Sequence, residues 1–139
     1  MEFAAKNLDG TQGQNSIVPL DKKIRVILRK LNSASGHIEA SSVMTRDGIS
    51  VASVLQDGVD TDRLGAMCAS LLSLADTTAK ELRRGNVQQL LLEGENGYIL
   101  IMHIGNKAVL GVVAHPKAQL GMVLVEARKT AEEILAVLS

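Results

Sequence analysis

The stretch VQQLLLEGENGYILIMHIGNKAVLGVVA, residues 87–114, predicts three consecutive strands at 87–93, 98–104 and 108–114. Glycine and asparagine occur in both short reversals between them, and turns this short make the neighbouring strands antiparallel. The middle strand, YILIMHI, is apolar at nearly every position, so both of its faces are expected to be covered. The sequence therefore predicts an antiparallel sheet that carries helices on both sides.

A hairpin is predicted on the N-terminal side of these strands by VMTRDGISVAS, residues 43–53. Apolar and polar residues alternate up to Arg46-Asp47-Gly48 and resume after it. Asp-Gly is favoured at tight reversals because both residues tolerate the positive φ that the primed turns demand. We predict strands at 37–45 and 49–55, and we interpret Arg46 and Asp47 as turn residues rather than catalytic groups.

Three segments have apolar residues at helical spacing: 19–36, 60–84 and 120–138. The predicted fold is α+β, a five-stranded antiparallel sheet in the element order α-β-β-α-β-β-β-α, with the long middle helix on one face and the two terminal helices on the other. Residues 1–18 mix Gly, Asn, Gln and Ser without an apolar period and are expected to form a flexible N-terminal tail. Residues 19–139 are expected to form one domain.

The middle helix is more apolar than a single sheet face requires. Its apolar stripe runs from Leu64 to Leu82, and it is widened by Ala66, Ala69 and Leu74. A helix that lies on one sheet needs an apolar arc of only about 100°. Part of this helix is therefore expected to pack against something besides its own sheet.

Composition excludes several classes of protein. Basic and acidic residues number 15 each, so the net charge favours neither nucleic acid nor a membrane surface as a partner. No run approaches the roughly 18 apolar residues that a membrane helix needs, and the start of the chain lacks the pattern of a signal peptide. A single cysteine, Cys68, excludes an internal disulfide. We expect a cytoplasmic protein without membrane insertion.

Residue types that carry catalysis or bind metals do not form a recognisable site. The histidines lie on different predicted elements: His37, His103 and His115. His103 is expected to be a hydrogen-bonded structural residue, and Cys68 lies on the apolar stripe, where a thiol behaves as a small hydrophobe. Asp60 is expected to cap the middle helix, and Asp57 and Asp62 suit its dipole better than they suit a calcium site. We therefore predict no enzyme activity, no cofactor and no metal.

Four segments together resemble the roadblock/dynein light chain family. They are the hairpin VMTRDGISVAS, the helix that opens TDRLGAMCA, the strands of residues 87–114 and the final LGMVLVEARKTAEEI. The resemblance covers about residues 20–138 in the right order and rests on a whole pattern of hydrophobic and glycine positions. It implies a profilin-like sandwich with helices on both faces of the sheet.

The same resemblance implies a homodimer or a heterodimer. In this family the third strands of two chains pair into one continuous sheet, and the long middle helices lie side by side. Carried onto this sequence, the pairing strand is residues 87–93, an edge that would otherwise be exposed. The expected interface residues are Leu64, Met67, Leu71, Leu74, Thr78, Val87, Gln89, Leu90, Leu91 and Leu92.

Family members include non-catalytic scaffolds and regulators of Ras-like small GTPases, and dynein-associated adaptors. One bacterial polarity regulator that this chain resembles acts as a dimer and speeds hydrolysis by its GTPase partner without donating an arginine finger. If this protein does likewise, it would act by remodelling the switch region of the partner, which is a positioning effect. The leading hypothesis is therefore a dimeric scaffold that binds a Ras-like small GTPase and modulates its nucleotide cycle or localisation. The expected partner surface comprises Asp60, Arg63, Lys80, Arg83 and Arg84.

A small-molecule sensor is the alternative from a different class. Sheets with helical covers of this sort resemble those of ligand-sensing domains, and Tyr98 or His103 could line a pocket. The strand residues are bulky aliphatics that suit a filled core, however, and the pattern does not show polar groups converging on a cavity. An enzyme is the third and weakest alternative.

Overall fold

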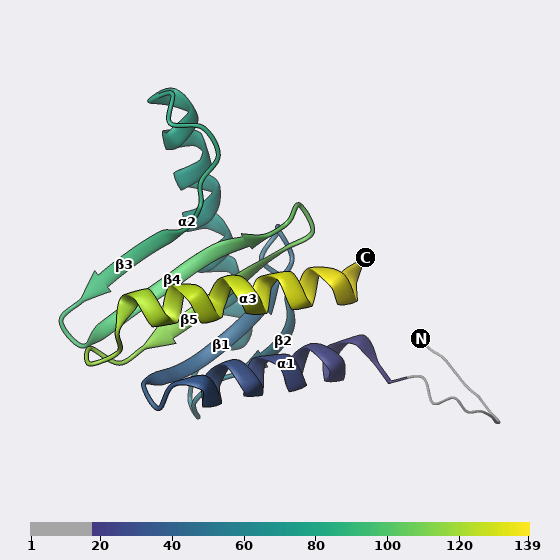
Figure 1. Cartoon of the computed structure of the whole chain (residues 1–139). Coiled ribbons are helices and arrows are strands. Elements are labelled where there is room, and N and C mark those ends of the chain that lie inside the picture. The colour runs from purple at the N-terminus through teal and green to yellow at the C-terminus, as the bar shows by residue number, and fades with distance from the viewer. Residues whose placement is uncertain (1–17) are drawn as a thin grey trace.

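The computed structural model describes residues 18–139, so the tail predicted for residues 1–18 lies outside this range except for Val18. The elements follow the predicted order (Figure 1). The helices are α1 (Leu20–Ala34), α2 (Thr61–Glu81) and α3 (Leu120–Leu138). The strands are β1 (Ile38–Met44), β2 (Ser50–Val54), β3 (Leu90–Gly94), β4 (Gly97–Ile104) and β5 (Ala108–Ala114). The predicted α+β fold class is confirmed.

One antiparallel sheet of five strands has the order β2-β1-β5-β4-β3. β1 pairs with β5, from Ile38 opposite Ala114 to Met44 opposite Val109, which joins the N-terminal hairpin to the C-terminal strands. β4 lies between β5 and β3, as its continuous apolar sequence requires. β2 and β3 are the two edges of the sheet.

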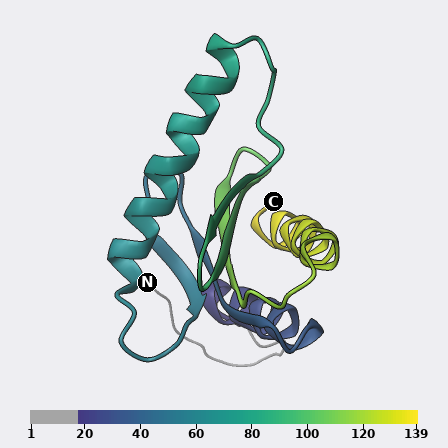
Figure 2. The ribbon, with the colours of Figure 1, turned by 90° about the vertical axis from the view of Figure 1, so that its left-hand side faces the viewer.

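The helices cover the two faces unequally. Figure 2 shows α1 and α3 together on one face and α2 on the other, so the predicted placement is confirmed. Ile24 and Leu28 of α1 share the larger core with Val123 and Ile134 of α3. The smaller core, between α2 and the sheet, consists of Met44, Cys68, Leu72, Ile101 and Val109.

α2 approaches the turn between β1 and β2 so closely that glycine is required on both sides. A Cβ added to Gly65 would lie 2.5 Å from the carbonyl oxygen of Gly48. A Cβ added to Gly48 would lie 2.8 Å from the Cα of Ala66. This backbone-to-backbone contact fixes the N-terminal half of α2 on the sheet.

The hairpin turn is not the primed turn that Asp47-Gly48 suggests. The N–H of Gly48 donates to the carbonyl of Thr45 at 2.9 Å, and the N–H of Thr45 donates to the carbonyl of Ile49 at 2.8 Å. Gly48 has a φ of 89°, whereas Asp47 does not have a positive φ. The loop therefore has three residues with glycine in the left-handed position. Arg46 and Asp47 are turn residues, as predicted.

Two predicted boundaries at the connection between α2 and β3 are wrong. α2 ends at Glu81 instead of near Arg84, and β3 begins at Leu90 instead of Val87. Val87 packs against the smaller core, and the Oε1 of Gln89 accepts a hydrogen bond from Arg128 of α3 at 3.0 Å. These residues cannot yet pair with β4 because the chain is still returning from the end of α2 to the sheet.

Candidate functional site

The outward side of α2 carries large apolar side chains. Met67, Leu71 and Leu74 are 49, 37 and 64 % exposed, and they follow one another at helical spacing. The inward side holds the buried residues Gly65, Cys68, Ala69 and Leu72. A row of exposed apolar side chains along one helix is typical of a protein-interaction surface. We call Met67, Leu71 and Leu74 the outer stripe of α2.

α2 also extends beyond the sheet. Figures 1 and 2 both show its C-terminal part projecting past the sheet on the side of β3. Leu72 is the last buried residue of a helix that continues to Glu81. The C-terminal turns of α2 are therefore poorly covered by the described part of the chain.

β3 leaves one side of its backbone open. Within residues 18–139 it pairs only with β4, from Leu90 opposite Ile101 to Gly94 opposite Gly97. Leu91 and Leu92 are exposed on opposite faces of this edge. An exposed apolar edge strand is a ready template for pairing with another chain.

The interface residues predicted from the sequence divide into two groups. One group is exposed and available to a partner: Met67, Leu71, Leu74, Thr78, Leu91 and Leu92. Leu64, Val87 and Leu90 are half-buried and pack on the smaller core, and Gln89 bonds to Arg128. These four residues therefore have contacts within one chain.

The residues of the predicted partner surface are exposed but do not form one patch. Asp60 and Arg63 lie at the start of α2, where the Oδ1 of Asp60 accepts from the backbone N–H groups of Asp62 and Arg63. Lys80, Arg83 and Arg84 lie at the other end. A 21-residue helix is about 30 Å long, so one chain does not bring the two groups together. The predicted cap at Asp60 is confirmed.

Arg83 adopts a backbone conformation that sequence reasoning did not predict. Its φ is 56°, in the left-handed region, and no other non-glycine residue among the described ones has a positive φ. The N–H of Arg83 donates to Lys80 and that of Arg84 to Ala79, at 3.0 and 2.7 Å, which is the Schellman termination of a helix. Glycine is usual at this position, so Arg83 is strained by about 1 kcal/mol or more.

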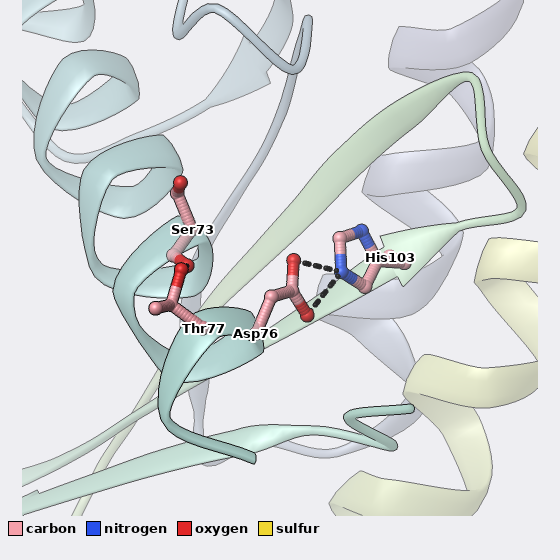
Figure 3. Close-up of polar contacts among 4 residues, drawn as sticks. All are labelled: Ser73, Asp76, Thr77 and His103. Carbon is pink, nitrogen blue, oxygen red and sulfur yellow. Dashed lines mark hydrogen bonds and ion pairs between the residues drawn. The ribbon is translucent and has the colours of Figure 1, made fainter. Parts of the chain in front are cut away.

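A polar groove lies between α2 and the sheet. It consists of two adjoining hollows of about 320 and 370 Å³, both lined by Arg46, Asp76 and His103. Figure 3 shows the Nε2 of His103 facing Asp76, and it lies 3.0 Å from each carboxylate oxygen. Thr77, beside Asp76, donates instead to the carbonyl of Ser73 in its own helix. His103 is thus a hydrogen-bonded residue, as predicted, and it ties α2 to β4.

The other candidate groups do not form a reactive site. Burial raises the pKa of the Cys68 thiol, which keeps it protonated. Tyr98 is buried, its hydroxyl donates to the carbonyl of Ala118, and it does not line the groove; of the two residues suggested as pocket lining, His103 lies there. His37 and His115 pack against each other with ring centroids 5.6 Å apart. Among the described residues, no group of three His, Cys, Asp or Glu side chains could hold a metal.

Comparisons with known proteins agree with this architecture. The family model described as the Roadblock/LC7 domain matches residues 24–114. The uncharacterized protein MJ1340 of Methanocaldococcus jannaschii is 34 % identical over 110 residues, which cover 79 % of this chain and 95 % of that protein. MglB of Myxococcus xanthus has the same fold at a TM-score of 0.78 and 20 % identity, over 84 % of this chain and 94 % of that one. An MglB with a tetrameric arrangement matches at a TM-score of 0.77 and 20 % identity, over 88 % of this chain and 92 % of that one. Profilins share the architecture.

Proposed function

Because the chain belongs to the Roadblock/LC7 family, we propose that it is a non-catalytic, dimeric scaffold that binds a Ras-like small GTPase. In this role it modulates the nucleotide cycle or the localisation of the GTPase in the cytoplasm. The observation that carries the proposal is the outer stripe of α2 beside the open edge of β3. Both are surfaces that a second protein would cover.

The open edge and the projecting helix support a homodimer of one particular geometry. Two β3 strands that pair antiparallel across a two-fold axis continue the sheet from one protomer into the next, and the axis then stands normal to the sheet. Because α2 projects past the β3 edge (Figures 1 and 2), each α2 would reach over the sheet of the other protomer. The outer stripes of the two helices would then bury each other.

The GTPase is proposed to dock on the paired α2 helices and their charged ends. The described residues lack a catalytic constellation, so the expected effect on hydrolysis is positional: the scaffold would hold the mobile loops of the GTPase in one arrangement. Asp60, Arg63, Lys80, Arg83 and Arg84 are proposed as polar contacts around this surface. None of the helices in residues 18–139 has the length and apolar character of a membrane span.

The test combines the oligomeric state with nucleotide turnover. Sedimentation velocity is expected to show a dimer, and single-turnover GTP hydrolysis by a Ras-like GTPase encoded near this protein is expected to change when the dimer is added. Co-elution of the two proteins on gel filtration would support tethering if hydrolysis stays the same. A monomer that neither changes turnover nor co-elutes contradicts the proposal.

A second candidate function, small-molecule sensing, is favoured by one observation: His103 lines the polar groove. Its Nε2 is already bonded to Asp76, and the groove is open, which argues against a tight pocket. Thermal-shift screening against metabolites tests this candidate, because a ligand that binds only the folded state raises the melting temperature. His103→Ala is the matched variant, and it should lose that rise if the groove is the site.

A further inference from the structure

The two ends of α2 carry opposite charge. Its start carries three acidic residues, Asp57, Asp60 and Asp62, against one basic residue, Arg63. Its end carries three basic residues, Lys80, Arg83 and Arg84, against one acidic residue, Glu81. The three acidic residues at the start and the three basic residues at the end are all exposed, and none of these six forms an ion pair within the described residues.

Within one chain the two ends do not neutralise each other. Asp62 and Lys80 lie near opposite ends of a straight helix that is about 30 Å long. Electrostatic interactions in water are screened over about 8 Å at physiological ionic strength. Each end therefore presents its charge to a partner.

The proposed dimer brings these ends together. A two-fold axis normal to the sheet reverses the direction of any helix that runs along the sheet, so the two α2 helices are antiparallel. Leu71 is the central residue of the outer stripe and also the midpoint of Thr61–Glu81. If the axis passes near Leu71, the start of each helix lies beside the end of the other.

We infer that the acidic start of α2 pairs with the basic end of α2 in a second copy of this chain, and that this charge match sets the antiparallel register of the dimer. The contact occurs twice, once on each side of the axis. It also selects partners, because a related chain with the charge reversed at one end would meet like charges there. This inference rests on the proposed homodimer and assigns the residues that specify it.

The strained backbone of Arg83 supports the same assignment. Its left-handed φ of 56° would be relieved by glycine, yet the position holds a long basic side chain. Within residues 18–139 this side chain makes no hydrogen bond or ion pair that would offset the strain. A role outside the single chain, opposite the acidic start of a second α2, gives the guanidinium a partner.

A charge-reversal pair tests the inference. One variant, R83E/R84E, makes both ends of α2 acidic, and the other, D57K/D62K, makes both ends basic; Asp60 is kept because it caps the helix. Each variant alone is expected to dimerise about tenfold more weakly or worse, because like charges now meet twice. An equimolar mixture is expected to form a heterodimer as tightly as wild type, measured by sedimentation equilibrium.

The control K22E/K23E makes the same change of net charge as R83E/R84E, but on α1, on the other face of the sheet, and should leave the dimer unchanged. Circular dichroism of each variant tests whether the variant is folded. A tight heterodimer in the mixture would show independently that both variants are folded. Wild-type-like dimers of R83E/R84E, or a mixture that fails to recover, would overturn the charge match. A wild-type protein that is monomeric at all concentrations would instead remove the proposed dimer itself.

The variant Arg83→Gly tests whether Arg83 contacts the second chain in the dimer or is only tolerated at this position. In a Leu74→Asp background, which is expected to be monomeric, R83G should raise the melting temperature because glycine relieves the strain. In the otherwise wild-type chain the same change should weaken dimerisation. If R83G raises the melting temperature and leaves dimerisation unchanged, Arg83 has no part in the contact.

Discussion

The two faces of the sheet are covered to different extents. On one face α1 and α3 lie side by side, and Ile24, Leu28 and Ile134 are fully buried between them and the strands. On the other face a single helix, α2, crosses the sheet, projects past its edge and keeps an exposed apolar stripe. One face is therefore fully covered within the chain, whereas the helix on the other face still exposes large apolar side chains.

The largest expected change is in the stability of the face that α1 and α3 cover. Leu28→Ala should lower the free energy of unfolding by about 2–5 kcal/mol, because Leu28 is fully buried and a cavity would remain. Val26→Ala, on the exposed side of the same helix, should cost about 0.5 kcal/mol or less. Urea denaturation measures both. A small loss for Leu28→Ala would show that this face repacks easily.

The next effect concerns association. Leu74→Asp should weaken the dimer about 100-fold, or roughly 3 kcal/mol, because a carboxylate would be buried in each protomer's contact. Val26→Asp is the matched control, since Val26 is 62 % exposed, close to the 64 % of Leu74, but lies on α1. Sedimentation equilibrium measures the dissociation constants. Equal effects at the two positions would contradict the proposed interface.

A smaller effect is expected where α2 meets the hairpin. Gly65→Ala should destabilise the protein by about 1–3 kcal/mol, because its Cβ would lie 2.5 Å from the Gly48 carbonyl oxygen. Gly121→Ala, in α3 with open space around it, should instead stabilise the protein by up to about 1 kcal/mol. Thermal unfolding distinguishes the two signs. A neutral Gly65→Ala would mean that α2 can shift on the sheet.

The smallest effect is expected at the polar groove. His103→Ala should cost about 1 kcal/mol or less, because the bond to Asp76 is partly exposed to water. A double-mutant cycle with Asp76→Ala isolates the contribution of the pair. A coupling energy of zero would show that the contact between His103 and Asp76 does not hold α2 on β4.

Much of the fold could be predicted from local pattern. The apolar run from Tyr98 to Ile104 indicated a strand covered on both faces, and β4 lies between β5 and β3. The excess of apolar residues along α2 indicated a second contact surface, and Leu74 is indeed exposed. The sequence pattern does not locate the start of β3 correctly, because Val87 contacts the smaller core and Gln89 bonds to α3 before the strand begins.

The candidate site could be predicted only in part. The sequence identified the charged residues of α2, and the predicted helix over 60–84 already places Asp60 and Arg63 far from Lys80, Arg83 and Arg84. It gave no signal for Arg83, because a left-handed backbone at a residue other than glycine is imposed by the hydrogen bonds that end the helix. His103 and Asp76 are distant in sequence, so their contact needs the crossing of α2 over β4.

The order of the elements, the positions of the reversals and the amphipathic faces can be derived from the sequence, since these depend on residues a few positions apart. The pairing of β1 with β5 and the projection of α2 past the β3 edge become visible only in the folded chain. Hydrophobic periodicity shows which side of an element is apolar, but it does not show which other element covers that side. The apolar surface that stays uncovered lies on the outer stripe of α2 and at the edge strand β3.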